Sequence, residues 1–166
     1  GGTNLTDVSH PFAATRTPAA CRLTLVSLVS LMQASMRTSP MTSFATLALP
    51  ENATATAPDG SNVRVLLSLA GGSMAHFELP PGRVSRPVTH RTVEEIWYVV
   101  SGSGQMWRKS EAKEQVVDLM PGVCLSIPLG THFQFKAAEF ESLGVIGITM
   151  PPWPGESEAI PVMGPW

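Results

Sequence analysis

Three side chains in this sequence have the chemistry of metal ligands or of proton-transferring groups. His90 and Glu95 lie in the stretch 80–104, and His132 lies in the stretch 120–136. In both stretches a Pro-Gly pair opens a run of β-forming residues. Two imidazoles and a carboxylate suit a divalent ion such as Fe, Mn, Ni or Zn better than a thiolate-selective metal. The sequence therefore presents a candidate metal site whose parts must be brought together from two separate stretches.

The glycines and prolines around these residues follow a known pattern. The first stretch resembles the first motif of the cupins, G-x5-H-x-H-x3/4-E-x6-G, and the second resembles their second motif, G-x5-P-x-G-x2-H-x3-N. The resemblance covers roughly residues 63–150. It implies a small jelly-roll barrel with an interior site, one divalent metal as a cofactor, and activities that range from isomerases to dioxygenases and lyases. The matching positions are Gly82, His90, Glu95 and Gly102 in the first motif, and Gly122, Pro128 and Gly130 in the second.

Two ligand positions of this pattern hold apolar residues. Val88 stands where the first motif has its first histidine, and Phe133 stands where the second motif has its histidine. His132 comes one residue before Phe133, and because side chains alternate across a strand it should point away from the interior. A β-bulge near Gly130 would instead turn it inward, since bulges re-aim side chains at barrel rims. By strict register, two of the four ligands remain.

His90 and Glu95 support two interpretations. In the first they hold a metal, alone or with His132, and Glu95 acts as a ligand or as the catalytic general base. In the second they hydrogen-bond each other or nearby backbone in a pocket without metal. Glu94 should point to the opposite face, and His76 is best interpreted as a hydrogen-bonded strand histidine.

Apolar side chains with the same strand parity should surround these two residues. They either line a ligand pocket, which is typically apolar with a few polar groups, or simply fill the core. Both interpretations can hold at different depths of the barrel. The residues are Val88, Trp97, Val99, Phe133 and Phe135.

The elements that must position these side chains are short strands. Fifteen prolines and fourteen glycines divide the chain into short β-type segments, and residues 41–150 show no convincing helical period. This pattern predicts an all-β domain, an antiparallel jelly-roll barrel at residues 41–150 with its motif glycines in turns. The expected strands are 43–49, 63–69, 74–79, 95–101, 104–109, 114–119, 123–128, 132–136 and 143–150.

The two ends of the chain have different compositions. Residues 1–40 contain one acidic residue, three arginines and a short apolar run, so they are interpreted either as a targeting peptide or as a poorly structured extension without function. That run is too short and too polar to span a bilayer. Residues 151–166 are rich in proline and should run extended over the barrel, with Trp153 or Trp166 as an anchor.

Composition excludes several classes of function. A net charge of −2 with scattered Lys and Arg argues against a nucleic-acid-binding surface, and no segment predicts a membrane partner. Cys21 and Cys124 do not predict a structural disulfide, so a cytoplasmic location is the default unless residues 1–40 direct the protein to an organelle or out of the cell. Motifs for phosphate binding and acyl-enzyme chemistry are missing from the sequence.

Two functional hypotheses follow, beside a purely structural role that would need only the barrel and its oligomer. The first is an enzyme or former enzyme with a partly lost metal site, whose pocket binds a small polar or carboxylate-bearing ligand near His90 and Glu95, with or without metal. The second is a non-catalytic ligand-binding or sensor module without metal. In both cases the expected partner is a small molecule bound inside the barrel, and the barrel should form a homodimer because its outer strand would leave a sheet edge open.

Overall fold

The computed structural model describes residues 43–166. The expectations for residues 1–40, and for Cys21, lie outside the described part of the chain. A membrane-spanning helix is not found among residues 43–166.

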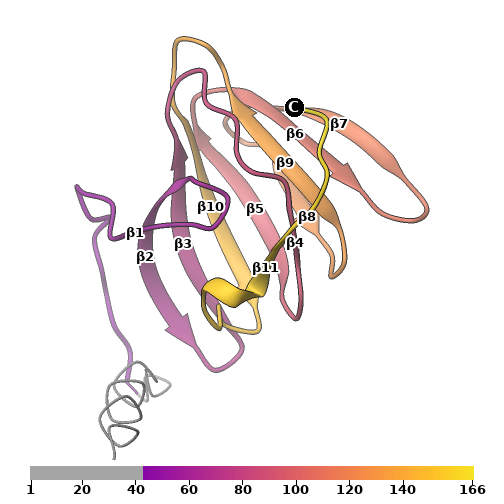
Figure 1. The fold of residues 1–166 in the computed structure, drawn as a ribbon. Helices are drawn as coiled ribbons and strands as arrows, with labels where there is room; N and C mark the ends of the chain where they lie inside the picture. Colours follow the sequence, from indigo (N-terminus) through magenta and orange to yellow (C-terminus); the bar gives the residue numbers. More distant parts are fainter. Residues whose placement is uncertain (1–42) are drawn as a thin grey trace, which may run out of the picture. The chain divides into compact units, whose positions relative to one another are not determined.

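The described chain folds into two antiparallel sheets that face each other (Figure 1). In spatial order, the first sheet, called sheet A, contains β1, β2, β3, β10, β5 and β8, and the second, called sheet B, contains β11, β4, β9, β6 and β7. Connections repeatedly pass from one sheet to the other, as in a jelly roll. The strands are β1 Ala55–Thr56, β2 Asn62–Leu69, β3 Gly72–Leu79, β4 Val88–His90, β5 Glu94–Ser101, β6 Gly104–Lys109, β7 Glu114–Leu119, β8 Cys124–Ile127, β9 His132–Ala137, β10 Leu143–Met150 and β11 Ala159–Pro161.

The predicted all-β jelly-roll fold is confirmed, and eight of its expected strands appear within a residue or two of their predicted bounds. The strand expected at 43–49 is wrong. Those residues are exposed and form no strand, and the first backbone pairing with β2 runs from Thr54 N–H to the Val63 carbonyl. Alternation describes which side chains share a face, but a strand also needs a neighbouring backbone to bond.

The sequence did not reveal three short strands, β1, β4 and β11. β4 carries His90 and pairs with β9 through Val88 and Phe133. β11 comes from the Pro-rich tail and pairs with β4, placing Ala159 opposite His90. The end of the chain is therefore part of sheet B rather than only a covering layer.

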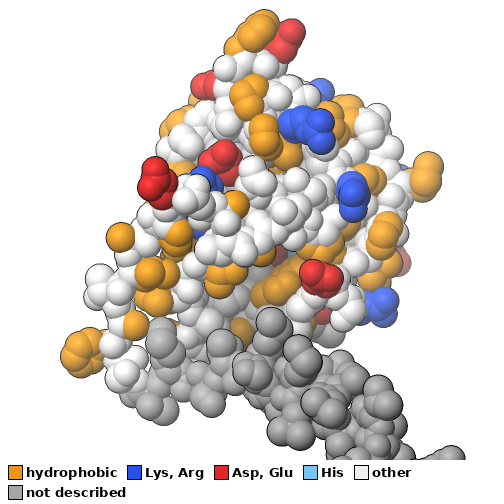
Figure 2. All heavy atoms as spheres, turned by 60° about the vertical axis from the view of Figure 1, so that its left-hand side comes forward, with side chains coloured by type: hydrophobic (Ala, Val, Ile, Leu, Met, Phe, Trp, Pro, Cys, Tyr) orange, Lys and Arg blue, Asp and Glu red, His pale blue; other side chains and the backbone are white. Residues whose placement is uncertain are grey.

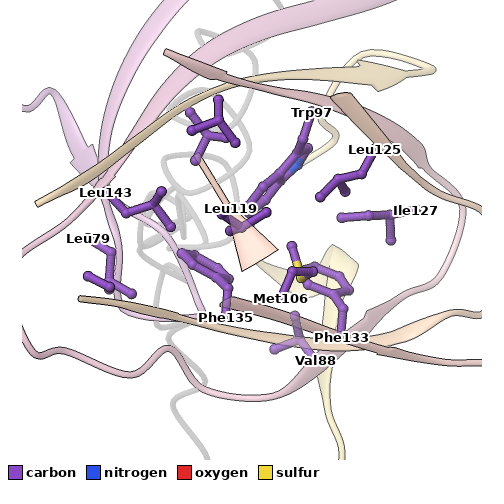
Figure 3. Close-up of a cluster of buried hydrophobic side chains, with 13 residues drawn as sticks. Leu79, Val88, Trp97, Met106, Leu119, Leu125, Ile127, Phe133, Phe135 and Leu143 are labelled. Carbon is purple, nitrogen blue, oxygen red and sulfur yellow. The ribbon is translucent and has the colours of Figure 1, made fainter. Parts of the chain in front are cut away.

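The space between the sheets is filled by large apolar side chains, which Figure 3 shows pointing inward from both sides. Trp97 lies at the centre of this core, stacked on Phe77 at 5.6 Å and edge-on to Phe135 at 5.0 Å between ring centroids. The five residues expected to line either a pocket or the core are all members of this cluster: Val88, Trp97, Val99, Phe133 and Phe135.

The turns contain glycine at the positions where the sequence motifs predict it. The four motif glycines expected in turns all have positive φ. The positive φ of Gly102 is 71°, and an added Cβ there would lie 1.8 Å from the Ser142 carbonyl oxygen, so the turn requires glycine. On the face drawn in Figure 2, charged side chains are scattered among apolar and neutral ones, without a large cluster of one sign.

Candidate functional site

The candidate site is built on His90, the last residue of β4. Alternation along this short strand buries Val88 and His90 and leaves Thr89 between them on the other face. The His90 ring lies edge-on to Phe133 and to Trp153, at 5.2 and 5.3 Å between centroids. An imidazole is thus held between an aromatic ring of the core and an aromatic ring of the tail.

Glu95 faces His90 from the opposite sheet. Its strand alternates without interruption, so Glu95, Trp97 and Val99 are buried while Glu94 is exposed, as the expected parity requires. The Trp97 Nε1–H donates to Glu95 Oε2 at 2.5 Å. The other carboxylate oxygen, Oε1, lies 3.9 Å from His90 Nδ1, which is too long for a direct hydrogen bond.

Burial decides the protonation of both groups. It disfavours the charged carboxylate and raises the pKa of Glu95 to about 7, against the lowering effect of the Trp97 hydrogen bond and with an added rise from the charge of Asp59. Burial likewise lowers the pKa of His90 to about 4, against the raising effect of Glu158. At neutral pH the site therefore combines an uncharged imidazole with a carboxyl group whose pKa is close to the pH.

One buried polar atom of the site is unpaired. His90 Nδ1 is buried and has no hydrogen-bond partner among the described residues. Buried polar atoms are nearly always bonded, and leaving one unpaired costs about 1–3 kcal/mol. The unpaired nitrogen faces the free oxygen of Glu95, so a polar ligand atom between them would satisfy both groups.

Two further polar side chains lie near Glu95 on its own sheet. Thr149 of β10 lies directly opposite Glu95 and shares a 2.6 Å hydrogen bond between hydroxyls with Ser73 of β3. The Ser73 hydroxyl also accepts the backbone N–H of Trp153 at 2.9 Å. The sequence analysis did not single out Thr149 and Ser73. The available signal was their strand parity, because both residues share it with apolar residues that point into the core.

The tail covers this end of the barrel and is fastened by Glu158. This buried carboxylate accepts the backbone N–H groups of Thr92 and Val93 at 2.5 and 2.9 Å and the Thr92 hydroxyl at 2.9 Å. The turn between His90 and Glu95 is thereby tied to the tail. Because the tail also carries Trp153, the position of that ring over His90 depends on the same attachment.

The structure does not bring His132 to His90 and Glu95. β9 pairs with β6 without a register shift from His132 to Ala137, so no bulge turns His132 inward, and Phe133 takes the buried position. The bulge alternative is therefore wrong. His76 has the parity of the outer face of β3 but is buried, and its Nδ1 is 3.5 Å from Arg64 Nη1.

The described residues do not fit a divalent metal. The pattern's other two ligand positions hold Val88 and Phe133, which are packed into the core and offer no donor atoms. Residues 43–166 contain no group of three His, Cys, Asp or Glu side chains placed to hold an ion. At the candidate site the donors are the His90 imidazole and the Glu95 carboxylate, which is fewer than the three protein ligands that catalytic sites typically use.

No family model and no curated protein matches the chain, but solved structures resemble it. A conserved protein with a double-stranded β-helix domain from Klebsiella pneumoniae matches with a TM-score of 0.57 and 14% identity, over 74% of this chain and 100% of that one. A cupin protein from Bacteroides fragilis matches with a TM-score of 0.53 and 23% identity, over 67% and 86%. Oxalate decarboxylase from Lactobacillus farciminis, solved as a formate complex, matches with a TM-score of 0.54 and 19% identity, over 61% of this chain and 31% of the enzyme.

Proposed function

The chain has the cupin fold, and from that premise we propose that it binds a small polar molecule inside the barrel, between His90 and Glu95, and exchanges a proton with it. The observation that carries the proposal is the buried, unpaired His90 Nδ1 that faces Glu95 Oε1 at 3.9 Å. A hydroxyl or carbonyl group of a ligand would bond both atoms. The aromatic rings around His90 would cover the rest of such a ligand.

Proton transfer is the chemistry that suits this pair. A general acid or base works best when its pKa is close to the working pH, and Glu95 meets this condition because burial raises its pKa to about 7. Trp97 holds one carboxylate oxygen, so the oxygen toward His90 is the one that gives or takes the proton. Isomerase and lyase reactions can proceed by such transfers, and we place the activity in this group.

A non-catalytic binding module is the second candidate. Its support is the apolar filling of the barrel by Val88 and Phe133, which gives the interior an aromatic lining and few polar groups. The fold does not choose between the two, because one fold hosts many functions.

A ligand screen that observes the Trp97 indole N–H resonance tests the proposal, because this group bonds to Glu95. A library of small polar molecules is added to the full chain, and each molecule that shifts the resonance is incubated in D2O to detect exchange of its C–H hydrogens. We expect hits that bind the parent and exchange hydrogen only while Glu95 is intact. Glu95→Gln should abolish exchange, and Glu94→Gln, on the outer face of the same strand, is the matched control.

The possible results separate the candidates. Binding without exchange in the parent would contradict the catalytic proposal and favour the binding module. A screen in which no molecule moves the Trp97 resonance would contradict both. Exchange that survives Glu95→Gln would show that another group transfers the proton.

A further inference from the structure

Arg108 is a charged side chain on the inner face of the barrel. It lies on β6 directly opposite Phe133 of β9, and Phe133 is buried in the core. Opposed residues of an antiparallel pair point to the same face of the sheet, so Arg108 also points inward. Arg108 is half-buried, and its Nη1–H donates to the Ser126 carbonyl at 2.6 Å in a solvent-exposed hydrogen bond that takes the side chain from sheet B across to β8 of sheet A.

The guanidinium is only partly satisfied by the described residues. Its Nε is buried and has no hydrogen-bond partner among them. Two ion pairs are found within residues 43–166, Arg64–Glu78 and Lys109–Glu114, and neither includes Arg108. A cation that bonds one carbonyl and holds a buried, unpaired N–H group is well suited to receive an anion.

Arg108 lies at the same end of the barrel as the proposed site. Its cross-strand neighbour Phe133 contacts the His90 ring at 5.2 Å between centroids. The carbonyl that it bonds belongs to Ser126, and the next residue, Ile127, pairs directly with Glu95. β8 is the neighbour of β5, the strand of Glu95, and neighbouring strands are about 4.8 Å apart. The guanidinium therefore ends beside β8, one strand away from Glu95.

We propose that Arg108 anchors a carboxylate of the ligand, so that the interior site takes a small monocarboxylate whose apolar part lies against Phe133. This inference rests on the proposed function and names its ligand class. Arg108 presents planar, paired N–H donors that match the geometry of a carboxylate.

Charge favours a carboxylate over a phosphoryl group. Among the Lys and Arg residues on the described strands, Arg108 alone is on the inner face, because Arg64, Lys109 and Lys136 have the opposite parity. One cation balances a single negative charge. A phosphoryl dianion would keep one unbalanced negative charge near the ionisable Glu95, whose own charge would repel it.

The test compares butyrate with its neutral isostere butyramide and with butyl phosphate on the unaltered full chain. Binding is followed at two side-chain N–H resonances, the Trp97 indole for occupancy of the interior and the Arg108 Nε–H for contact with the anion; Arg108→Met identifies the latter by its loss. We expect butyrate to move both resonances and to bind at least about tenfold more tightly than butyramide, as expected for a hydrogen bond to a charged group. Arg108→Met should reduce butyrate affinity to the level of butyramide, whereas Lys109→Met, which removes a neighbouring positive charge from the outer face, should not.

Each result tests either the anchoring role of Arg108 and its ligand class or the interior site itself. Equal binding of butyrate and butyramide, or unchanged butyrate affinity in Arg108→Met, would overturn the anchoring role while leaving the interior site in place. Tighter binding of butyl phosphate than of butyrate would overturn the ligand class. If none of the three probes moves the Trp97 resonance, the interior site itself fails, and the inference fails with it.

Discussion

Glu95 and His90 should make opposite contributions to the pH dependence of stability. The pKa of Glu95 rises from 4.5 to about 7 on folding, so the folded state binds this proton more tightly than the unfolded state does. The resulting stabilisation is complete below pH 4.5 and is lost as the pH rises to 7. The pKa of His90 falls from 6.5 to about 4, so its contribution is complete above pH 6.5 and is lost as the pH falls to 4.

The two contributions are similar in size. Each pKa differs by about 2.5 between the two states, and at 1.36 kcal/mol per pKa unit this corresponds to roughly 3 kcal/mol. The parent should therefore show little net slope from these two residues between pH 4.5 and 6.5, because one gain offsets the other loss. Removing either residue should uncover the slope of its partner.

Urea unfolding at pH 4 to 8, followed by tryptophan fluorescence, measures these slopes. Relative to the parent, Glu95→Gln should gain up to about 3 kcal/mol in the free energy of unfolding as the pH rises from 4.5 to 7, because glutamine cannot ionise. His90→Asn should gain a similar amount as the pH falls from 6.5 to 4. Glu94→Gln controls for the loss of a carboxylate at the adjacent, exposed position of the same strand.

The sign of each pH-dependent change in the free energy of unfolding tests the protonation scheme. If Glu95→Gln loses stability relative to the parent as the pH rises, the carboxylate is stabilised in its charged form and burial does not dominate its pKa. If the difference between Glu95→Gln and the parent does not change with pH, or only follows that of Glu94→Gln, the carboxyl group is not desolvated as described. Either result would refute the protonation scheme on which the proposed acid–base role depends.

Three other predictions concern metal binding, turns and assembly. Restoring the ligand pattern with Val88→His and Phe133→His should convert a weak or absent metal site into a tight one for Mn, Fe, Ni or Zn, at some cost in packing. Titration of the parent and of the variant with these metals should show the difference. Tight binding by the parent would mean that donors other than the described residues complete the site. Gly102→Ala should lower the free energy of unfolding by clearly more than Gly130→Ala, for which roughly 1–2 kcal/mol is expected. The reason is that an added Cβ meets the Ser142 backbone at Gly102 and open space at Gly130. Equal changes in the urea midpoint of the two variants would contradict this. The chain should sediment as a homodimer because β1 pairs with only two residues of β2 and leaves the rest of that sheet edge open, and a monomer at high protein concentration would count against it.

The sequence alone determined the fold class, most strand positions and the parity of each strand. Period-2 alternation places Glu95 and Trp97 on one face and Glu94 on the other whatever the partner strands are. Glycines at positive-φ turns divide the chain at the correct places, as at Gly102. These features are local, so they can be read from neighbouring residues.

Tertiary structure decided everything that depends on a partner. Residues 43–49 alternate like a strand but find no neighbouring backbone, whereas Val88–His90 is too short to show a pattern and becomes β4 because β9 and β11 flank it. The side of the barrel on which His132 falls depended on whether a bulge interrupts β9, and only the observed register excludes one. The altered pKa values of His90 and Glu95 come from burial between two sheets and beneath Trp153, and burial is a property of the packed molecule rather than of any stretch of its sequence.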